Sequence, residues 1–343
     1  MKYSLQAKNM MFKTGFMSAC RRLWRSSNPA ILRYHSIVEP AANFYSSPSI
    51  AIAPGEFEAH IRYLSERYNI ISLDVVADCI SEKRPFPERA VALTFDDGYR
   101  DNFNAYRIMK KYNVQGTFYV AAGCLGEGEP LWLFEVIYLI GNTQRSSISL
   151  GVKGKNVDIS LASDSKKNLA IRKITEIIKS NNLEVREKVR EQLGNQTADV
   201  ADFHEKASQV MLTWEQIREM SENGMAIGGH TMTHINLPNA EYEDAVREIN
   251  DCKRVIEEKT GKPVRHFSYP NSGNYDYYND SIKEIVMRAG YSTSTTSVNG
   301  LADSNSDPFE LSRIRVTPNL AEVMYQMECE PIVDGILERI RCC

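Results

Sequence analysis

Residues 90–98 read AVALTFDDG, and this stretch decides the fold. It begins with a mostly apolar run, residues 90–95, and continues directly into Asp96, Asp97 and Gly98. A short apolar run that ends in turn residues is typical of a buried strand in a parallel sheet. We therefore predict a strand over residues 90–95 with the two carboxylates at its carboxyl end.

Strand and helix signals alternate on both sides of this stretch. Runs compatible with strands occupy residues 30–35, 117–120, 225–229, 266–269 and 291–295. Helical segments begin at Pro54 and cover residues 101–112, 212–223, 243–260 and 281–289, with Thr213 as an expected N-cap and Gly261 as an expected helix end. This alternation is typical of a parallel α/β fold, and 343 residues fit one barrel of this type.

The alternation stops between about residues 127 and 210. Residues 131–140 form an aromatic-rich apolar segment, and residues 166–193 are strongly charged with helical spacing. We predict a helical insertion here, within a barrel domain that spans residues 29–343. Residues 1–28 precede the barrel as a basic arm.

The bulk composition excludes several classes of protein. Apolar residues make up 43% of the chain and charged residues 25%, which is ordinary for a globular protein. A net charge of −3 gives no electrostatic basis for binding nucleic acid. The seven cysteines are scattered without close CxxC pairs, which fits neither a disulfide framework nor a zinc ribbon and favours reduced thiols in a cytoplasmic protein.

The first 25 residues are basic but contain no uninterrupted apolar run long enough for a secretory signal. The longest apolar stretch, residues 131–140, is interrupted by Glu135 and is too short to span a bilayer. Residues 10–24 can form a basic amphipathic helix, so peripheral membrane contact through residues 10–25 is one expectation. A solvated arm is the alternative.

Two further segments lie at the ends of predicted strands and carry reactive side chains. HTMTH occupies residues 230–234, and FSYP occupies residues 267–270. In α/β barrels the active site lies at the carboxyl ends of the strands. We therefore expect both segments to meet Asp96 and Asp97 on one face of the barrel.

His230 and His234 are four residues apart, so a helical turn would point both imidazoles to one side. Two histidines and one carboxylate leave coordination positions open on a catalytic ion, which can then hold a water and polarise a carbonyl. Taken alone, the histidines can be ordinary loop residues and the acids can simply form a turn. A strand-end acid pair together with a strand-end HxxxH is far more specific than either motif.

TFDDG at residues 94–98 and HTMTH at residues 230–234 resemble the first two motifs of the NodB-like polysaccharide deacetylases, carbohydrate esterase family 4. The resemblance covers about residues 29–320 without the insertion. It implies a distorted (β/α) barrel that removes N- or O-linked acetyl groups from sugars with a divalent ion, zinc above all. It also implies that Asp97, His230 and His234 bind the ion and that Asp96 is the general base.

The resemblance extends to groups that face the substrate. The backbone N–H that stabilises the oxyanion belongs in the family to the residue that is Asn271 here, and we expect Tyr269 and Pro270 to lie beside it. Tyr99 and Trp132 are candidates for stacking on sugar rings, although simple packing is the commoner role of such aromatic residues.

The chain departs from the family pattern at the third and last motifs. Residues 268–271 read SYPN, so the arginine that often orients the base is missing there, and Arg265 lies three residues away. Residues 311–315 read LSRIR and carry no histidine to act as the acid.

A histidine near the N-terminus can replace the missing acid. Residues 32–35 read LRYH and resemble the N-terminal L-x-Y-H of the poly-N-acetylglucosamine deacetylases, whose elements look circularly permuted. By that resemblance His35 is the expected general acid, and a histidine hydrogen-bonded within the barrel is the alternative. We expect the other histidines, His60, His204 and His266, to be structural or exposed.

Together these features predict a metal-dependent hydrolase that removes acetyl groups from an N-acetylated sugar, in a polysaccharide or linked to a lipid. The alternatives are a non-catalytic carbohydrate-binding barrel and a hydrolase of a non-sugar amide such as a formyl group. Binding alone needs no base beside a metal, which argues against the first alternative. The same ion and base would serve any small amide, so the second stays open.

Overall fold

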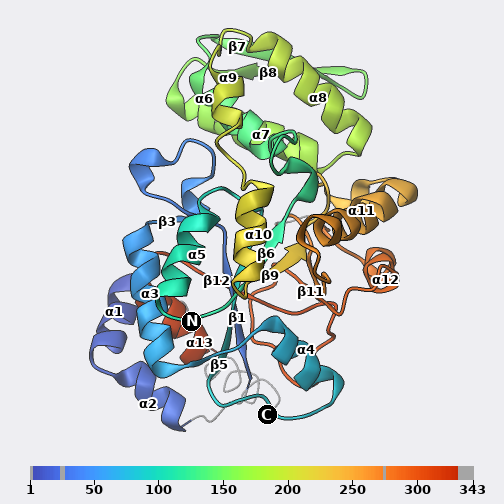
Figure 1. The fold of residues 1–343 in the computed structure, drawn as a ribbon. Coiled ribbons are helices and arrows are strands. Elements are labelled where there is room, and N and C mark those ends of the chain that lie inside the picture. The colour runs from blue at the N-terminus through green and yellow to red at the C-terminus, as the bar shows by residue number, and fades with distance from the viewer. Residues whose placement is uncertain (1–2, 24–27, 273–275, 331–343) are drawn as a thin grey trace, which may run out of the picture.

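The computed structural model describes residues 3–23, 28–272 and 276–330. Its centre is a curled sheet of parallel strands that forms a half-barrel with helices outside it (Figure 1). The strand order is β11 (Thr293–Thr295), β10 (His266–Ser268), β9 (Ala226–Gly229), β6 (Thr117–Val120), β5 (Ala90–Phe95), β1 (Ala30–Tyr34) and β12 (Ile314–Arg315), while β4 (Asn69–Ile70) pairs with the start of β5. The predicted α/β barrel fold is confirmed.

Most helices around the sheet lie close to the predicted positions, whereas α4 was not predicted. They are α3 (Pro54–Arg67), α4 (Leu73–Ser81), α5 (Asn102–Lys111), α10 (Trp214–Glu222), α11 (Tyr242–Thr260) and α12 (Asp280–Arg288). The Thr213 hydroxyl caps α10 by accepting a hydrogen bond from the Gln216 N–H, as predicted. Gly261 ends α11 with a φ of 67°, a conformation that glycine adopts without strain.

The strands are buried because helices cover the sheet on the outside and side chains fill its inside. All six residues of β5 are buried. The rings of Tyr34, Phe95 and Phe118, from three adjacent strands, stack with centroids 5.2 and 4.4 Å apart. Burial of each such ring stabilises the fold by about 1.5–3 kcal/mol, which fixes the strands that carry the site.

The insertion is mostly helical, as predicted, and it also contains a β-hairpin that was not predicted. Its elements are α6 (Trp132–Asn142), β7 (Ser147–Val152), β8 (Lys155–Ser160), α7 (Asp164–Lys179), α8 (Leu183–Gln196) and α9 (Phe203–Ala207). The hairpin turns at Lys153 and Gly154, which both have positive φ, and buried and exposed residues alternate along β7. That alternation was the sequence signal for the hairpin.

The N-terminal segment forms two helices instead of one. α1 (Leu5–Lys13) and α2 (Phe16–Leu23) are separated by Thr14 and Gly15, and Trp24 and Arg25 lie outside the described residues. Both helices pack against α13 (Leu320–Glu328): Lys8 pairs with Glu322 at 2.7 Å, and the Met17 side chain is only 2% exposed. The described part of this segment is therefore docked on the barrel and is not a solvated arm.

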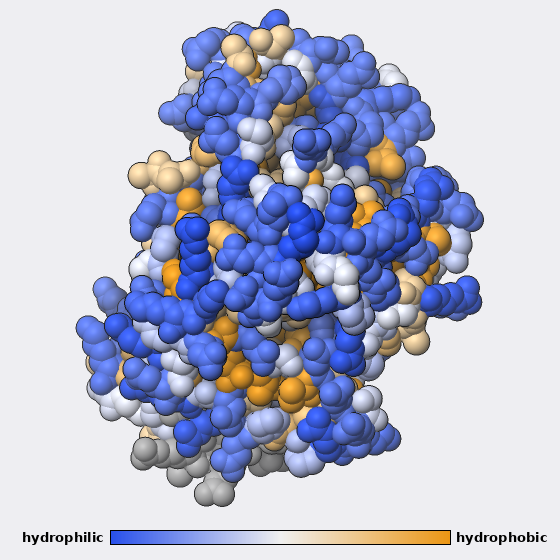
Figure 2. Space-filling model, viewed as in Figure 1, coloured by the Kyte–Doolittle hydropathy of each residue, from blue (hydrophilic) through white to orange (hydrophobic). Residues whose placement is uncertain are grey.

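Hydrophilic residues cover most of the face in view, including the insertion above the barrel (Figure 2). No helix among the described residues is both long enough and apolar enough to cross a membrane. The five described cysteines, Cys20, Cys79, Cys124, Cys252 and Cys329, are free thiols.

Candidate active site

The carboxyl ends of three strands bring the predicted site residues together. Asp96 and Asp97 follow β5, His230 follows β9, and His35 follows β1. β5 pairs with β1 and β6, and β6 pairs with β9, so the register of the sheet sets the distances between these positions. The expectation that the motifs meet on one face is confirmed.

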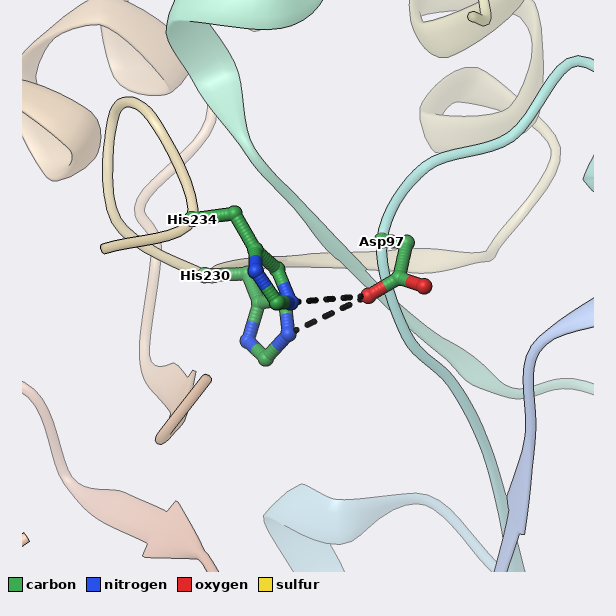
Figure 3. Close-up of side chains that lie close together, drawn as sticks. All are labelled: Asp97, His230 and His234. Atoms are coloured by element: carbon green, nitrogen blue, oxygen red, sulfur yellow. Dashed lines mark ion pairs between the residues drawn. The ribbon is translucent and has the colours of Figure 1, made fainter. Parts of the chain in front are cut away.

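Asp97, His230 and His234 point toward one another from two segments (Figure 3). Asp97 Oδ1 lies 3.4 Å from His230 Nε2 and 3.3 Å from His234 Nε2. All three residues are buried. Two zinc ligands at about 2.0–2.1 Å from the ion and at tetrahedral angles are about 3.3 Å apart. The spacing of the donor atoms therefore fits a single divalent ion.

The hydrogen bonds of His230 also suit a metal ligand. His230 Nδ1 lies 2.7 Å from the Ser268 carbonyl oxygen, which can only accept, so this nitrogen carries the proton. Nε2 then keeps its lone pair for an ion, the arrangement that orients most ligating histidines. Burial opposes ionisation of Asp97, but its interactions with the two neighbouring imidazoles hold the pKa of its carboxyl well below the usual value. The carboxylate is thus available as an anionic ligand.

The loop between the two histidines is not helical, so the conditional expectation of a helical turn was wrong. Instead, Thr231 and His234 have φ of 64° and 54°. These left-handed residues bend the chain so that both imidazoles still converge, with ring centroids 4.9 Å apart. The ligand spacing comes from an irregular loop that surrounding residues hold.

Asp96 is held by an arginine that sequence reasoning missed. Arg313 donates from Nη1 to Asp96 Oδ1 at 2.6 Å and from Nη2 to Oδ2 at 2.7 Å. Arg313 also donates to Thr94 Oγ1, Ser268 Oγ and the Thr296 carbonyl oxygen, and its side chain is fully buried. Burial opposes ionisation of Asp96, but the Arg313 charge and hydrogen bonds lower its pKa to about 2. Asp96 is therefore ionised and rigidly oriented.

Arg265, the nearest arginine to the third motif, has a different partner. It pairs with Asp74 of α4 at 2.6 Å and does not contact Asp96. The signal for Arg313 was the LSRIR stretch itself, at the position of the last family motif. The sequence around Arg313 does not show which strand the two-residue strand β12 pairs with. That partner is β1, which lies far away in the sequence.

His35 lies beside Asp96, with its Nε2 3.8 Å from Asp96 Oδ2. Burial lowers the pKa of His35 to about 4, although the charges of Asp97 and Asp96 act in the opposite direction. The imidazole is therefore neutral at pH 7 and lies within reach of the predicted base.

Tyr99, Tyr269 and Trp132 are buried, which favours packing over stacking on a sugar ring. Tyr99 is fully buried and packs against Tyr45, and burial with the nearby Asp97 carboxylate raises its pKa well above the usual value. Tyr269 is buried and donates its hydroxyl proton to the Phe309 carbonyl oxygen. Trp132 donates its indole N–H to the His234 carbonyl oxygen. These contacts give the three rings a packing role around the site.

Pro270 is buried, and Asn271 is partly exposed at the end of β10. Asn271 has a φ of 77°, its carbonyl oxygen accepts a hydrogen bond from Ser297 Oγ, and its Nδ2 donates to the Ile235 carbonyl oxygen. These bonds hold the side chain of Asn271 and the peptide that follows it, and so restrain the backbone next to the Asn271 N–H.

The remaining histidines are structural or exposed, as expected. His60 is buried and contacts the Pro318 carbonyl oxygen, His266 is buried between Thr293 and Asp74, and His204 is exposed in the insertion.

Comparison with known proteins agrees with this geometry. The family model for polysaccharide deacetylase matches residues 83–147 and 152–294, which is more than half of the chain. The Bacillus subtilis (strain 168) protein YxkH, whose name assigns it to the polysaccharide deacetylases, is 23% identical over 293 residues, 85% of this chain and 72% of that protein.

Solved structures share the fold at low sequence identity. The Streptococcus pyogenes deacetylase PplD in complex with acetate has a TM-score of 0.57 and 23% identity, covering 88% of this chain and 98% of that chain. IcaB from Ammonifex degensii has a TM-score of 0.56 and 18% identity, covering 89% and 97%. The matched motifs, the half-barrel and the family model lead to one conclusion: the chain belongs to the polysaccharide deacetylase family and is a hydrolase of that family.

Proposed function

We propose that this protein is a zinc-dependent deacetylase that removes the acetyl group from an N-acetylated sugar of a polysaccharide or a lipid-linked glycan. The observation that carries the proposal is the buried triad of Asp97, His230 and His234 directly beside the arginine-held carboxylate of Asp96. Asp97 would bind the ion through a carboxylate and the histidines through Nε2, a donor set that suits zinc. A divalent ion bound there would supply the Lewis acid that polarises the acetyl carbonyl and activates a water.

Asp96 would act as the general base. Each carboxylate oxygen has a second lone pair, so a carboxylate that accepts two hydrogen bonds from Arg313 can still accept the proton of the attacking water. The Asn271 N–H would donate to the oxygen that becomes negatively charged in the tetrahedral state. The hydrogen bonds that hold Asn271 in place support this role.

His35 would carry the proton to the leaving group. A neutral imidazole 3.8 Å from Asp96 can receive the proton that Asp96 takes from the water. His35 would then donate it to the sugar nitrogen as the carbon–nitrogen bond breaks, which yields acetate and a free amine. The proton that Asp96 takes from the water is the one that His35 gives to the sugar nitrogen, so no further proton donor is needed.

The rivals differ in what they release. A non-catalytic carbohydrate-binding barrel would release nothing, and an amide hydrolase of the formyl type would release formate. A buried, ionised Asp96 beside a triad that can hold an ion favours hydrolysis over binding alone.

The test is product analysis with a substrate panel: N-acetylglucosamine oligomers, a lipid-linked N-acetylated sugar and an N-formyl amide. We expect acetate from an N-acetylated sugar and a loss of at least about 10²-fold in kcat for Asp96→Asn. A folded, zinc-loaded protein that releases formate but no acetate would contradict the proposal, as would equal acetate release by Asp96→Asn.

A further inference from the structure

The loop that carries His230 and His234 has a shape that its own residues do not favour. Thr231 and His234 have positive φ, and Thr231 is β-branched, which makes this conformation especially strained. Residues in such a conformation persist only where the surrounding structure holds them. The contacts of this loop therefore decide whether the two imidazoles stay aimed at Asp97.

One set of contacts comes from the barrel helix α11. Glu248 Oε2 accepts hydrogen bonds from the N–H groups of Met232 and Thr233 at 2.8 and 2.9 Å. Glu248 Oε1 accepts from the Thr233 hydroxyl at 2.6 Å. Glu248 is 7% exposed, so hydrogen bonds from the loop replace the hydrogen bonds that its carboxylate would make with water.

The second set of contacts comes from the insertion. Arg186 in α8 donates from Nη1 to the Thr233 carbonyl oxygen at 3.1 Å and from Nη2 to the Thr233 hydroxyl oxygen at 2.8 Å. The hydroxyl thus joins the guanidinium of Arg186 to the carboxylate of Glu248, and the loop is clamped between two opposite charges. Arg186 is 3% exposed, so water does not compete for these bonds.

Two other helices of the insertion hold the loop at its far end. Trp132 in α6 donates its indole N–H to the His234 carbonyl oxygen at 3.0 Å. The carbonyl oxygen of Lys179, the last residue of α7, accepts hydrogen bonds from Asn236 Nδ2 and Asn239 Nδ2 at 2.9 and 2.7 Å. Each of the three helices α6, α7 and α8 therefore contacts this segment at a different point. These contacts leave Nε2 of His230 and His234 available for an ion.

We propose that Arg186 is a positioning residue for the metal site, so that the insertion sets the ion affinity of the barrel. The inference rests on the proposed metal-dependent function. Arg186 acts through Thr233: it keeps the strained loop closed between the two ligating histidines. Loss of the guanidinium would also remove the positive charge that is connected to the buried Glu248 carboxylate through the Thr233 hydroxyl.

The test is the zinc dissociation constant of the full chain, measured by competition with a chromophoric chelator. Groups that orient metal ligands typically change ion affinity by about 10–100-fold, so we expect at least about tenfold weaker zinc binding for Arg186→Gln. Arg186→Lys should recover part of the affinity, because it keeps the charge but loses the planar pair of donors. At saturating zinc, kcat should fall more than KM changes.

Arg190→Gln is the matched control on the same helix. Arg190 forms ion pairs with Glu129, Glu135 and Glu187, all within the insertion, and does not touch the loop. This variant should lower the thermal unfolding midpoint and leave zinc affinity unchanged. Zinc affinity of Arg186→Gln within twofold of wild type would overturn the inference.

A second variant covers the case in which Arg186→Gln does not fold. Trp132→Phe removes the single hydrogen bond to the His234 carbonyl oxygen and keeps an aromatic ring, and we expect it to weaken zinc binding by a smaller factor. Unchanged zinc affinity in both Trp132→Phe and Arg186→Lys would then overturn the inference. A folded wild-type protein that binds no zinc would instead overturn the proposed metal site.

Discussion

Asp96 and Arg313 are 217 residues apart in the sequence, and the charge of the proposed base depends on their pairing. The guanidinium keeps Asp96 ionised in a buried position, and its two parallel hydrogen bonds fix the plane of the carboxylate. A carboxylate with a pKa of about 2 is a weak base in solution, so its orientation is what would make it effective.

We expect Arg313→Lys to lower kcat by about 10²-fold, because a lysine cannot hold both carboxylate oxygens and a small misplacement of a reacting group is costly. Zinc affinity should not change, since Arg313 contacts none of the three proposed ligands. The measurement is steady-state acetate release together with zinc competition. Arg315→Lys, a change at an exposed neighbour, is the control, and equal kcat in both variants would refute the role of Arg313.

We expect His35→Gln to lower kcat by about 10²–10⁴-fold, the usual range for loss of a general acid. Zinc binding should persist, because His35 lies beside Asp96 and is not one of the converging ligands. The measurement is acetate release at saturating zinc, with His204→Gln as a control at an exposed position. Wild-type activity in His35→Gln would remove His35 from proton transfer.

The sequence was sufficient to predict which residues converge as the candidate metal triad, because HxxxH and the acid pair keep their spacing within short segments. It was not sufficient to predict that Arg313 pairs with Asp96, because that contact depends on the pairing of β12 with β1. Adjacency to a motif in the sequence also does not show whether a ring faces the substrate or the core, and Tyr99 and Tyr269 are buried.

At the scale of elements, segments with a clear apolar pattern were predictable and two-residue strands were not. β5 and α11 match their predicted bounds closely because they carry such a pattern. β4 and β12 have two residues each, too few for any pattern, and tertiary pairing alone makes them strands. The hairpin of β7 and β8 was overlooked between two stronger helical signals.

The N-terminal helices expose apolar side chains beside basic ones, and we propose that they touch a membrane surface. Leu5, Met10 and Phe16 are about half exposed or more, and Lys13 is exposed near them. We expect the protein to sediment with vesicles that contain phosphatidylserine, and Met10→Glu with Phe16→Glu to reduce the bound fraction several-fold.

The control for vesicle binding is Met287→Glu, an equally exposed apolar side chain on α12. It should leave sedimentation unchanged. Equal binding of all three proteins, or no binding by wild type, would show that these helices serve only to dock on α13.

At the scale of the whole molecule, burial of histidines makes stability depend on pH. Burial lowers the pKa of His60 to about 4, against the effect of its hydrogen bond to Pro318, and the pKa of His35 is lowered similarly. In the unfolded chain both titrate near 6.5. Between pH 6.5 and 4 the unfolded state therefore binds more protons, and acid favours unfolding.

We expect the unfolding free energy of the metal-free protein to fall as the pH is lowered from 7 to 4.5. The shift of His60 from 6.5 to about 4 corresponds to at most about 3 kcal/mol. Urea denaturation at several pH values measures this, and His60→Gln should flatten the dependence. An equal slope in wild type and His60→Gln would exclude His60 as its source.

The central claim is that hydrolysis occurs at an ion held by Asp97, His230 and His234. Acetate release from N-acetylglucosamine oligomers before chelation, after chelation and after return of zinc tests it most directly, with Asp97→Ala beside wild type. We predict that chelation abolishes wild-type activity, that zinc restores it, and that Asp97→Ala stays inactive throughout. Wild-type activity that survives removal of the ion, or full activity in Asp97→Ala, would contradict the claim.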